Sequence, residues 1–406
     1  MKRRNFLTAL SYSTAGMLIP VGLNSCVAQT DAQTSRPKRL VVIFLRGAID
    51  GLNVVVPHQD ADYYRSRPTI ALPYPHEKNG VLDLDGFFGL HPELQDLMPL
   101  WQQKSLAFVH ASGTQITERS HFQAQDYMES GTPGVKTTPD GWMNRLLAEL
   151  PQEKPTQALN VGVTTPLILK GQMKIANLKP GKNSTARIST DNPYVNRAFN
   201  SLYSGTDDLS RAYQDGLKTR EIVIAELNQE MISASGGATN VNAFVDDAAE
   251  VARLMVGNTR TQLAFMDVGG WDTHINQKAM HNRLLPDLGR GLATLVKGLE
   301  PIYADTAIVV MSEFGRTVKE NGNGGTDHGH GNAMWLLGGA IRGGEIYGEW
   351  LGLKQSVLHQ NRDLSVTTDF REVLGLILQQ HLSVSHNSLN RVFPDYKLTN
   401  KIDFFA

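Results

Sequence analysis

The stretch Thr306-Ala307-Ile308-Val309-Val310-Met311 is short, apolar and rich in β-branched residues, and it predicts a buried strand that ends at Ser312. A second buried strand is predicted at 333–338. The loop between them is rich in Gly and Asn, and it carries four side chains that can bind a metal: Glu313, Asp327, His328 and His330. Open α/β sheets place their chemistry on loops at the carboxyl ends of parallel strands. This loop therefore indicates both the fold class and the position of a site.

The same loop also has a simpler interpretation, as a solvated polar loop whose histidines are incidental. The spacing His328-x-His330 argues against it, because residues i and i+2 of an extended chain point to the same side. Carboxylate and imidazole ligands together suit Zn best, with Mn possible, whereas Ca or Mg sites use fewer histidines. We therefore expect a divalent metal here, as one or two ions.

Other apolar segments predict the rest of the sheet. We expect neighbouring parallel strands at 40–45, 105–110, 261–267, 306–311 and 333–338. Helical periodicity is found at 208–231, 241–255, 277–299 and 373–381, the last of these capped by Asp369. The region 150–205 is mixed, with β-like pieces at 159–163 and 167–169, and we interpret it as an insertion that lines the site. The order of strand, loop and helix predicts a doubly wound, mostly parallel α/β sheet with helical and mixed insertions.

Polar residues follow several of these strands directly. Asp50 comes after 40–45 between turn glycines, where an Asp that bonds its own backbone is the simpler interpretation. Ser120 follows 105–110 and forms a capping box with Gln123, so it is either a helix N-cap or a hydroxyl stabilised by a helix N-terminus. Asp272 and His274 follow 261–267 and again place a carboxylate and an imidazole at a strand end.

Residues 1–30 have the pattern of an export leader rather than of a folded element. Lys2-Arg3-Arg4-Asn5-Phe6-Leu7 is a twin-arginine pattern, and the apolar run that follows is too short and too polar for a permanent membrane span. A basic start to a cytosolic helix is the alternative. Twin-arginine export carries folded proteins, often with a cofactor already loaded. We therefore expect an exported protein of the periplasm or cell envelope, with the twin-arginine translocase as a partner.

The single cysteine of the chain, Cys26, lies at the end of this leader. Leu23-Asn24-Ser25-Cys26 resembles a lipobox, although Asn24 is atypical, and a lipid on Cys26 would hold the protein on a membrane. The alternative is ordinary cleavage after Ala28. In either case the body of the protein has no intramolecular disulfide, so its stability depends on a large core.

The rest of the chain has the composition of a globular enzyme. Residues 31–37 are polar and resemble a tether, and 38–406 show no repeat or long linker, which favours one domain. Apolar residues make up 41% of the chain and charged residues 19%. The net charge is −1, with Lys and Arg scattered along the chain, and this argues against a nucleic-acid-binding surface.

Several short motifs together resemble a family of exported bacterial proteins of unknown function. That family has a twin-arginine leader and belongs to the alkaline phosphatase/sulfatase-like superfamily. The matching segments are Phe44-Leu45-Arg46-Gly47 with Asp50-Gly51-Leu52, Arg119-Ser120-His121-Phe122 with Ala124-Gln125, Gly270-Trp271-Asp272-Thr273-His274, Glu313-Phe314-Gly315-Arg316, and Thr326-Asp327-His328-Gly329-His330-Gly331. They span nearly the whole chain after the leader, and as a set they are specific to the family.

The resemblance implies a two-metal hydrolase with an alkaline phosphatase-like fold. It implies Asp50 as a metal ligand after the first strand, Ser120 as a nucleophile at a helix start, and Asp272 with His274 at one metal. The sequence departs from the superfamily at Glu313-Phe314, where Asp-His is expected. Glu can bind a metal but Phe cannot. Asp327 and His328 then supply ligands from the loop, with His330 as the final one.

Two classes of function follow from this resemblance. In the first, metal ions about 4 Å apart clamp the attacking and leaving oxygens of phosphoryl or sulfuryl transfer. Ser120 attacks, and Arg46, Arg119 or Arg316 holds the nonbridging oxygens of a small-molecule or polymer ester. In the second, the chain is a secreted binding or assembly protein that keeps the fold, with or without a metal, and lacks turnover. The sequence does not identify a substrate.

Overall fold

The computed structural model describes residues 36–151, 157–162, 164–178, 235, 238–258, 260–399 and 402–405. The chain divides into two compact units, Met1–Arg36 and Pro37–Ala406, and the fold described below is that of the second unit. The expected leader with Cys26 and the expected helix at 208–231 lie outside the described residues. Among the helices that are described, none combines the length and apolar character needed to cross a membrane.

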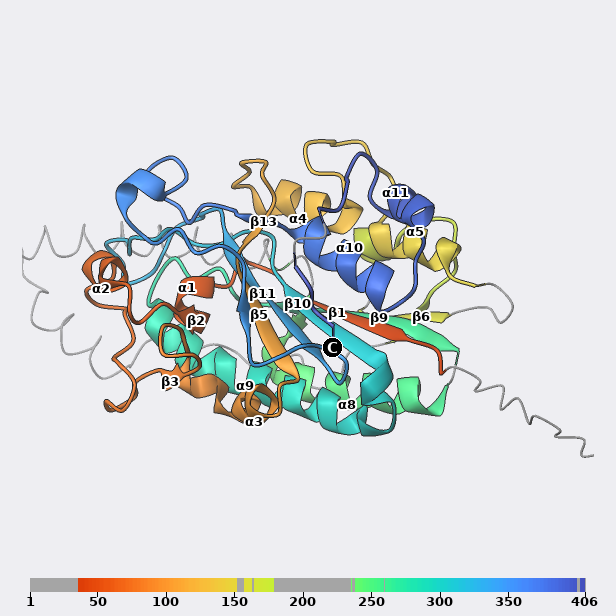
Figure 1. The fold of residues 1–406 in the computed structure, drawn as a ribbon, viewed down its shortest axis with the longest axis horizontal. Coiled ribbons are helices and arrows are strands. Elements are labelled where there is room, and N and C mark those ends of the chain that lie inside the picture. Colours follow the sequence, from red (N-terminus) through yellow and green to blue (C-terminus); the bar gives the residue numbers. More distant parts are fainter. Residues whose placement is uncertain are drawn as a thin grey trace, which may run out of the picture. The chain divides into compact units, whose positions relative to one another are not determined.

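A mostly parallel sheet forms the centre of this unit (Figure 1). Its central strands, in spatial order, are β5 (Leu106–Gly113), β11 (Asn332–Gly338), β10 (Thr306–Met311), β1 (Arg39–Leu45) and β9 (Thr261–Gly269). Five shorter strands extend it: β6 (Gln157–Val161), β7 (Ala176–Leu178), β8 (Thr239–Asn240), β12 (Ile346–Tyr347) and β13 (Thr368–Asp369). A small separate sheet is formed by β2 (Val55–Val56), β3 (Leu82–Asp83) and β4 (Gly89–Leu90).

The strand β1 is buried along its whole length, because helices cover both faces of the sheet. Val41 and Ile43 point into one core, and Val42 and Phe44 point into the other. The first core is closed by α3 (Met98–Gln102), α8 (Val241–Gly257) and α9 (Gln277–Gly298). The second is closed by α4 (His121–Ser130), α5 (Trp142–Glu149), α10 (Phe370–Gln380) and α11 (His386–Val392). Figure 1 shows the two groups of helices on opposite sides of the sheet. The predicted doubly wound α/β fold is confirmed.

One of the expected parallel strands runs the other way. β1 pairs in parallel with both β10 and β9, as predicted, but β11 is antiparallel to β10 and to β5. A parallel return needs a crossover connection, usually a helix, to carry the chain back to the starting edge. The loop 312–331 contains no such helix, so β11 starts at the edge where β10 ends. The prediction of a parallel strand at 333–338 is therefore wrong.

The region interpreted as an insertion belongs in part to the main sheet. β6 pairs in parallel with β9, so the β-like piece at 159–163 extends the sheet. The piece at 167–169 is a short 3-10 helix rather than a strand, and residues 179–205 lie outside the described part. The helix expected after Asp369 is confirmed as α10, whose N-cap is Asp369, although α11 follows it.

The loop 312–331 is tightly folded on itself by backbone contacts. The N–H of Gly315 donates to the carbonyl of His330 at 2.9 Å, and the N–H of Gly329 donates to the carbonyl of Gly315 at 2.8 Å. A Cβ atom on Gly315 would lie 1.8 Å from the carbonyl oxygen of Gly331. This close approach of two backbone segments requires glycine at 315, and it brings both ends of the loop to the same edge of the sheet.

We predict that Gly315→Ala destabilises the protein by at least about 2 kcal/mol, because the added methyl group overlaps backbone that cannot move freely. Gly322 lies in the same loop with nothing within 4 Å of its Cβ position, so Gly322→Ala is the matched control and should change stability by less than about 0.5 kcal/mol. Urea unfolding followed by circular dichroism measures both. Equal effects of the two substitutions would contradict the tight crossing.

Candidate metal centre

Three histidines and one aspartate meet at the edge of the sheet where β1, β9 and β10 end. Nε2 of His328 lies 2.8 Å from Nε2 of His121 and 2.9 Å from Nε2 of His274. Asp272 joins them, with Oδ1 at 3.0 Å from Nε2 of His274 and 3.3 Å from Nε2 of His328. His121, Asp272 and His328 offer ligand atoms that all lie within 4.8 Å of one another. This group is a candidate metal site.

The other ring nitrogen of each histidine faces a hydrogen-bond acceptor. Nδ1 of His121 donates to Oε1 of Glu313 at 2.7 Å, and Nδ1 of His328 donates to the backbone carbonyl of Arg119 at 2.8 Å. Nδ1 of His274 faces Oδ1 of Asp327 at 3.2 Å. In the neutral rings the proton therefore sits on Nδ1, and the lone pairs of all three Nε2 atoms point toward one another. Acceptors behind the ring are the usual way in which proteins orient metal-binding histidines.

Asp272 supplies an oxygen ligand to this arrangement. Its Oδ1 accepts a hydrogen bond from Nη2 of Arg316 at 2.5 Å. Its Oδ2 is buried, accepts no hydrogen bond, and lies 3.5 Å from Nε2 of His121. A buried carboxylate oxygen without a donor is costly unless a cation or another donor satisfies it. The orphaned oxygen therefore marks the side of Asp272 on which a cation would bind.

The distances fit a small divalent ion. Ligand atoms that are each about 2.1 Å from a tetrahedral Zn lie about 3.4 Å from one another. One carboxylate oxygen of Asp272 and the Nε2 atoms of His121 and His328 lie within 4.8 Å of one another, and the two Nε2 atoms are 2.8 Å apart. A set of imidazoles with one carboxylate is typical of Zn and unlike the oxygen-rich sites of Mg or Ca. The residues present therefore fit the metal that the sequence predicts.

The electrostatics of the group favour a positive charge at its centre. Burial opposes protonation of His121, but the carboxylates of Asp272 and Glu313 outweigh it and raise the pKa of His121 to about 9. Burial lowers the pKa of His328, so this ring is the neutral one. Burial opposes ionisation of Asp272, yet its contacts with the three histidines and the charge of Arg316 hold its pKa well below the usual range. The carboxylates thus stabilise a cation, either a proton or a metal ion.

The local folding of each segment explains how these side chains meet. Asp272 and His274 follow β9, Glu313 follows β10, and His121 is the first residue of α4 after β5. His328 lies in the folded loop 312–331, where Arg362 donates to its carbonyl oxygen. The parallel strands end at one edge of the sheet, so residues up to two hundred positions apart come together there.

Three of the predicted ligands therefore lie in the cluster, and two others support it. Asp272, His274 and His328 are in contact, as expected. Glu313 and Asp327 lie behind histidine rings, where they orient the ligands rather than face the centre. Oε1 of Glu313 is held further by Gln125 at 2.9 Å and by the N–H of Gly47 at 2.8 Å.

Asp50 is committed to other partners. Its fully buried carboxylate accepts from Nη1 of Arg67 at 2.5 Å and from Nε2 of Gln277 at 2.5 Å. Its Oδ1 also caps α1 (Gly51–Val54) through the N–H of Leu52 at 3.2 Å. Burial would raise the pKa of Asp50, but the charge of Arg67 holds it below the usual value. The guanidinium of Arg67 takes the place that a cation would have, so Asp50 is not free to bind a metal.

His330 also lies apart from the cluster. Its ring stacks on His359 with 4.0 Å between ring centroids. Burial and the neighbouring His359 lower the pKa of His330 to about 4. The two rings of the His328-x-His330 motif thus have different neighbours, because Gly329 packs against the backbone of Arg316 and the loop is not a regular extended strand there. The expected convergence of His330 with Asp272 is not found among the contacts of either residue.

The three predicted catalytic residues differ in exposure. Arg316 is fully buried and donates to the backbone carbonyls of Gly47, Ala48 and Thr326 as well as to Asp272, so it organises the site and does not face a substrate.

Arg119 is 36% exposed and forms an ion pair with Asp363, and its Nε has no hydrogen-bond partner among the described residues. Ser120 is exposed and is the N-cap residue of α4, as one of the two interpretations expected, but its side chain forms no cap hydrogen bond.

His121 is a candidate ligand that was not predicted from the sequence. It belongs to the motif Arg119-Ser120-His121-Phe122, in which the capping-box pattern favoured Ser120. The available signal was its position directly after a strand–loop segment at the start of a helix, which is the same placement that singled out Ser120.

Several solved structures are similar to this chain. A protein in the alkaline phosphatase superfamily from Vibrio parahaemolyticus is 12% identical, with 77% of this chain and 63% of that chain covered and a TM-score of 0.37. The C-terminal periplasmic domain of EcEptC from Escherichia coli in complex with Zn is 11% identical, with 90% and 88% covered and a TM-score of 0.42. The lipoteichoic acid synthase LtaP from Listeria monocytogenes is 8% identical, with 87% and 74% covered and a TM-score of 0.40.

At these identities and TM-scores, function has to be argued from the site itself. No curated protein matches the sequence. One family does match, and it covers residues 37–393, which is nearly all of the second compact unit. The chain belongs to this family, which is described as a protein of unknown function, DUF1501.

Proposed function

We propose that this protein is a zinc-dependent hydrolase of phosphate or sulfate esters. The observation that carries the proposal is the meeting of the Nε2 atoms of three histidines beside Asp272, whose Oδ2 accepts no hydrogen bond from the described residues. In the proposed site His121, Asp272 and His328 hold the ion, and His274 borders it. A bound zinc ion supplies Lewis acidity toward an ester oxygen. The residues around it bind and orient the ester.

Two arginines beside the metal site are suited to holding the oxygens of the ester. Arg119 and Arg362 are both partly exposed and both bond to Asp363, which is fully buried. The backbone carbonyl of Arg119 accepts from His328, and Arg362 donates to the backbone carbonyl of His328, so both lie next to a ligand. One carboxylate does not neutralise two guanidinium groups, and the Nε of Arg119 has no partner. These groups can bind a phosphate or sulfate through charge-assisted hydrogen bonds.

We further propose Ser120 as the nucleophile. It is exposed and directly precedes the ligand His121, and its side chain makes no cap hydrogen bond. A free hydroxyl beside a metal site can be activated through a lowered pKa. The alternative, a binding protein without turnover, also uses the metal site but has no need of this hydroxyl.

The first prediction from this proposal concerns metal content. We expect about one zinc ion per chain rather than the two that the family resemblance implies, because Arg67 already neutralises Asp50. His121→Ala and His328→Ala should weaken binding by more than about 100-fold, and Glu313→Gln, which removes only the charge behind His121, by about 10- to 100-fold. His330→Ala is the control and should keep the zinc. Elemental analysis and competition with a zinc chelator measure these values.

Two zinc ions per chain, or loss of zinc in His330→Ala with retention in His121→Ala, would contradict this assignment of ligands.

The second prediction concerns turnover. Zinc-loaded protein should hydrolyse p-nitrophenyl phosphate or p-nitrophenyl sulfate, and Ser120→Ala should lower kcat by on the order of 10³-fold or more while zinc content stays the same. Ser120→Thr keeps a hydroxyl and should retain part of the activity. If Ser120→Ala is as active as the unchanged protein, serine is not the nucleophile. If the zinc-loaded protein hydrolyses neither ester, the binding-protein alternative is correct.

The third prediction concerns the leader. We propose that the chain is exported by the twin-arginine translocase and carries a lipid on Cys26, because the lone cysteine follows Leu23-Asn24-Ser25. Cys26→Ser should then shift the protein from the membrane fraction to the soluble periplasmic fraction, measured by fractionation and immunoblotting. Unchanged processing and fractionation of Cys26→Ser would favour cleavage after Ala28.

A further inference from the structure

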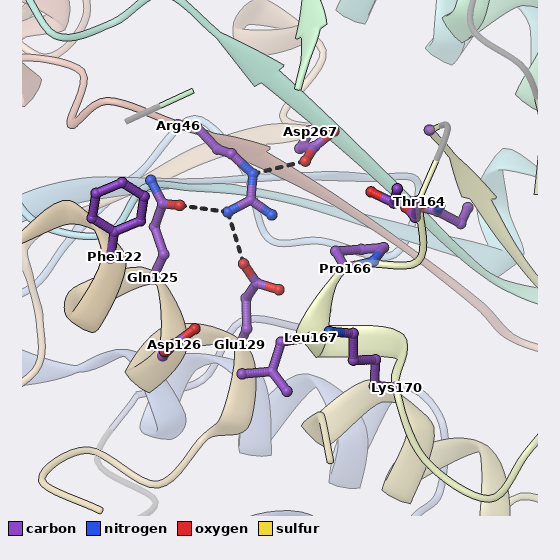
Figure 2. A pocket seen from close by; sticks show the side chains of 12 residues that line it. Arg46, Phe122, Gln125, Asp126, Glu129, Thr164, Pro166, Leu167, Lys170 and Asp267 are labelled. Carbon is purple, nitrogen blue, oxygen red and sulfur yellow. Dashed lines mark hydrogen bonds and ion pairs between the residues drawn. The ribbon is translucent and has the colours of Figure 1, made fainter. Parts of the chain in front are cut away.

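A pocket of about 260 Å³ lies beside the metal centre, between α4 and the segment that follows β6 (Figure 2). Small-molecule sites typically have volumes of about 300–1,000 Å³, so a pocket near the lower end of this range has room for one small ligand or a single unit of a polymer. Arg46 and Asp267 form its floor, and both come from the ends of central strands of the sheet. Phe122 and Asp126 line it from α4, and Lys170 lines it from the opposite side.

The floor of the pocket contains a polar group that lacks a partner. Arg46 is only 6% exposed. Its Nε donates to Asp267 at 2.7 Å, and its Nη1 donates to Gln125 at 2.7 Å and contacts Glu129 at 2.8 Å. No described residue forms a hydrogen bond with Nη2, and in Figure 2 this atom points to the side where Pro166 and Thr164 lie. A buried guanidinium donor directed into a cavity is a binding group for an oxygen atom of a ligand.

The charges of the pocket exclude an anion as its natural occupant. The carboxylates of Glu129 and Asp267 already neutralise Arg46, and Asp126 adds a further negative charge against Lys170. Burial and the charge of Glu129 raise the pKa of Asp126, which indicates an excess of negative potential there. A phosphate or sulfate group would therefore bind at the metal and the arginines, not here. The pocket suits a neutral ligand.

The remaining groups match the chemistry of a sugar ring. A sugar hydroxyl both donates and accepts, and the pocket offers donors on Arg46 and Lys170 together with acceptors on Asp126 and Asp267. Phe122 adds an aromatic ring that is 62% exposed at the edge of the pocket, where it can stack on the C–H face of a sugar.

The pocket is joined to the metal centre by a hydrogen-bonded chain. Arg46 donates to Gln125, Gln125 donates to Glu313, and Glu313 accepts from the ligand His121. His121 opens α4, and Gln125 and Glu129 follow on the same face, which places the pocket about 6 to 12 Å along the helix from the ligand. This separation is suitable for a substrate whose ester lies at the metal and whose body occupies the pocket.

We propose that this pocket binds a sugar ring, and that the ester substrate is therefore a phosphorylated or sulfated carbohydrate. The identity of the ester substrate rests on the proposed hydrolase function, whereas sugar binding by the pocket does not. The two parts are tested separately, by a binding measurement without an ester and by a kinetic measurement with one.

The binding measurement uses saturation-transfer difference NMR of the full-length, zinc-loaded protein with methyl α-D-galactoside and methyl α-D-glucoside as probes. We expect saturation transfer to the ring protons of at least one glycoside, and loss of this transfer in Phe122→Ala and in Asp126→Asn. Phe122→Tyr keeps the aromatic ring and should retain binding. Asp246→Asn, an exposed aspartate on α8, is the matched control and should also retain it. Absence of transfer to both glycosides, or equal transfer in all variants, would overturn the sugar site.

The kinetic measurement compares kcat/KM for D-galactose 6-sulfate and D-glucose 6-phosphate with kcat/KM for the p-nitrophenyl esters. In Phe122→Ala and Asp126→Asn, the ratio of sugar ester to p-nitrophenyl ester should fall at least about tenfold, because only the sugar ester uses the pocket. An unchanged ratio overturns the link between pocket and substrate. If glycosides bind but the protein hydrolyses no ester, the hydrolase function fails and the sugar site remains. If p-nitrophenyl esters are hydrolysed but glycosides do not bind, the sugar site fails alone.

Discussion

The site depends on one buried ion pair, between Arg316 and Asp272. Both side chains are fully buried and 2.5 Å apart. The guanidinium also donates to the backbone carbonyls of Gly47 and Ala48 after β1, of Trp271 after β9, and of Thr326 within the loop 312–331. One side chain thus fixes the ends of three segments that are far apart in sequence. Removing one partner of such a pair typically costs about 3–5 kcal/mol, because the remaining charge is left uncompensated.

A second buried arginine, Arg67, supplies the positive charge beside Asp50. Arg67 pairs with Asp50 and also donates to the backbone carbonyls of Thr317 and Val318, so it joins the first βα turn to the loop 312–331. A guanidinium is a fixed cation that needs no loading and cannot be lost by dialysis or chelation. At Asp50 the protein therefore satisfies a buried carboxylate permanently, whereas at Asp272 one oxygen is left for a ligand. This difference between the two aspartates is the physical basis for expecting one metal ion.

Much of the fold followed from the sequence, because continuous apolar strands and amphipathic helices carry local signals. β1, β9 and β10 were located correctly, and α8, α9 and α10 matched their periodic segments. The antiparallel direction of β11 was not predicted, because the apolar pattern of a strand is the same in both directions. Only the connection to the preceding strand determines whether the two strands are parallel. Asp272, His274 and His328 could be found because each follows a strand in a motif. Arg67 could not be found, because its pairing with Asp50 is a tertiary contact with no periodic or motif signature. His330 was misassigned because the two-residue spacing was interpreted as extended chain.

The short helix α4 contributes both to the candidate metal site and to the pocket beside it. His121, Gln125 and Glu129 are four residues apart, so they lie on one face and bond in turn to the metal centre, to Glu313 and to Arg46. Glu313 accepts hydrogen bonds from both His121 and Gln125 through the same oxygen, and therefore orients a ligand and the wall of the pocket at once. A ligand in the pocket that moves Arg46 or Gln125 would change the hydrogen bonds that Glu313 accepts. The orientation of the His121 ring, which donates one of these hydrogen bonds, would then change as well. The pocket wall and the candidate metal site thus share the carboxylate of Glu313 as a hydrogen-bond acceptor.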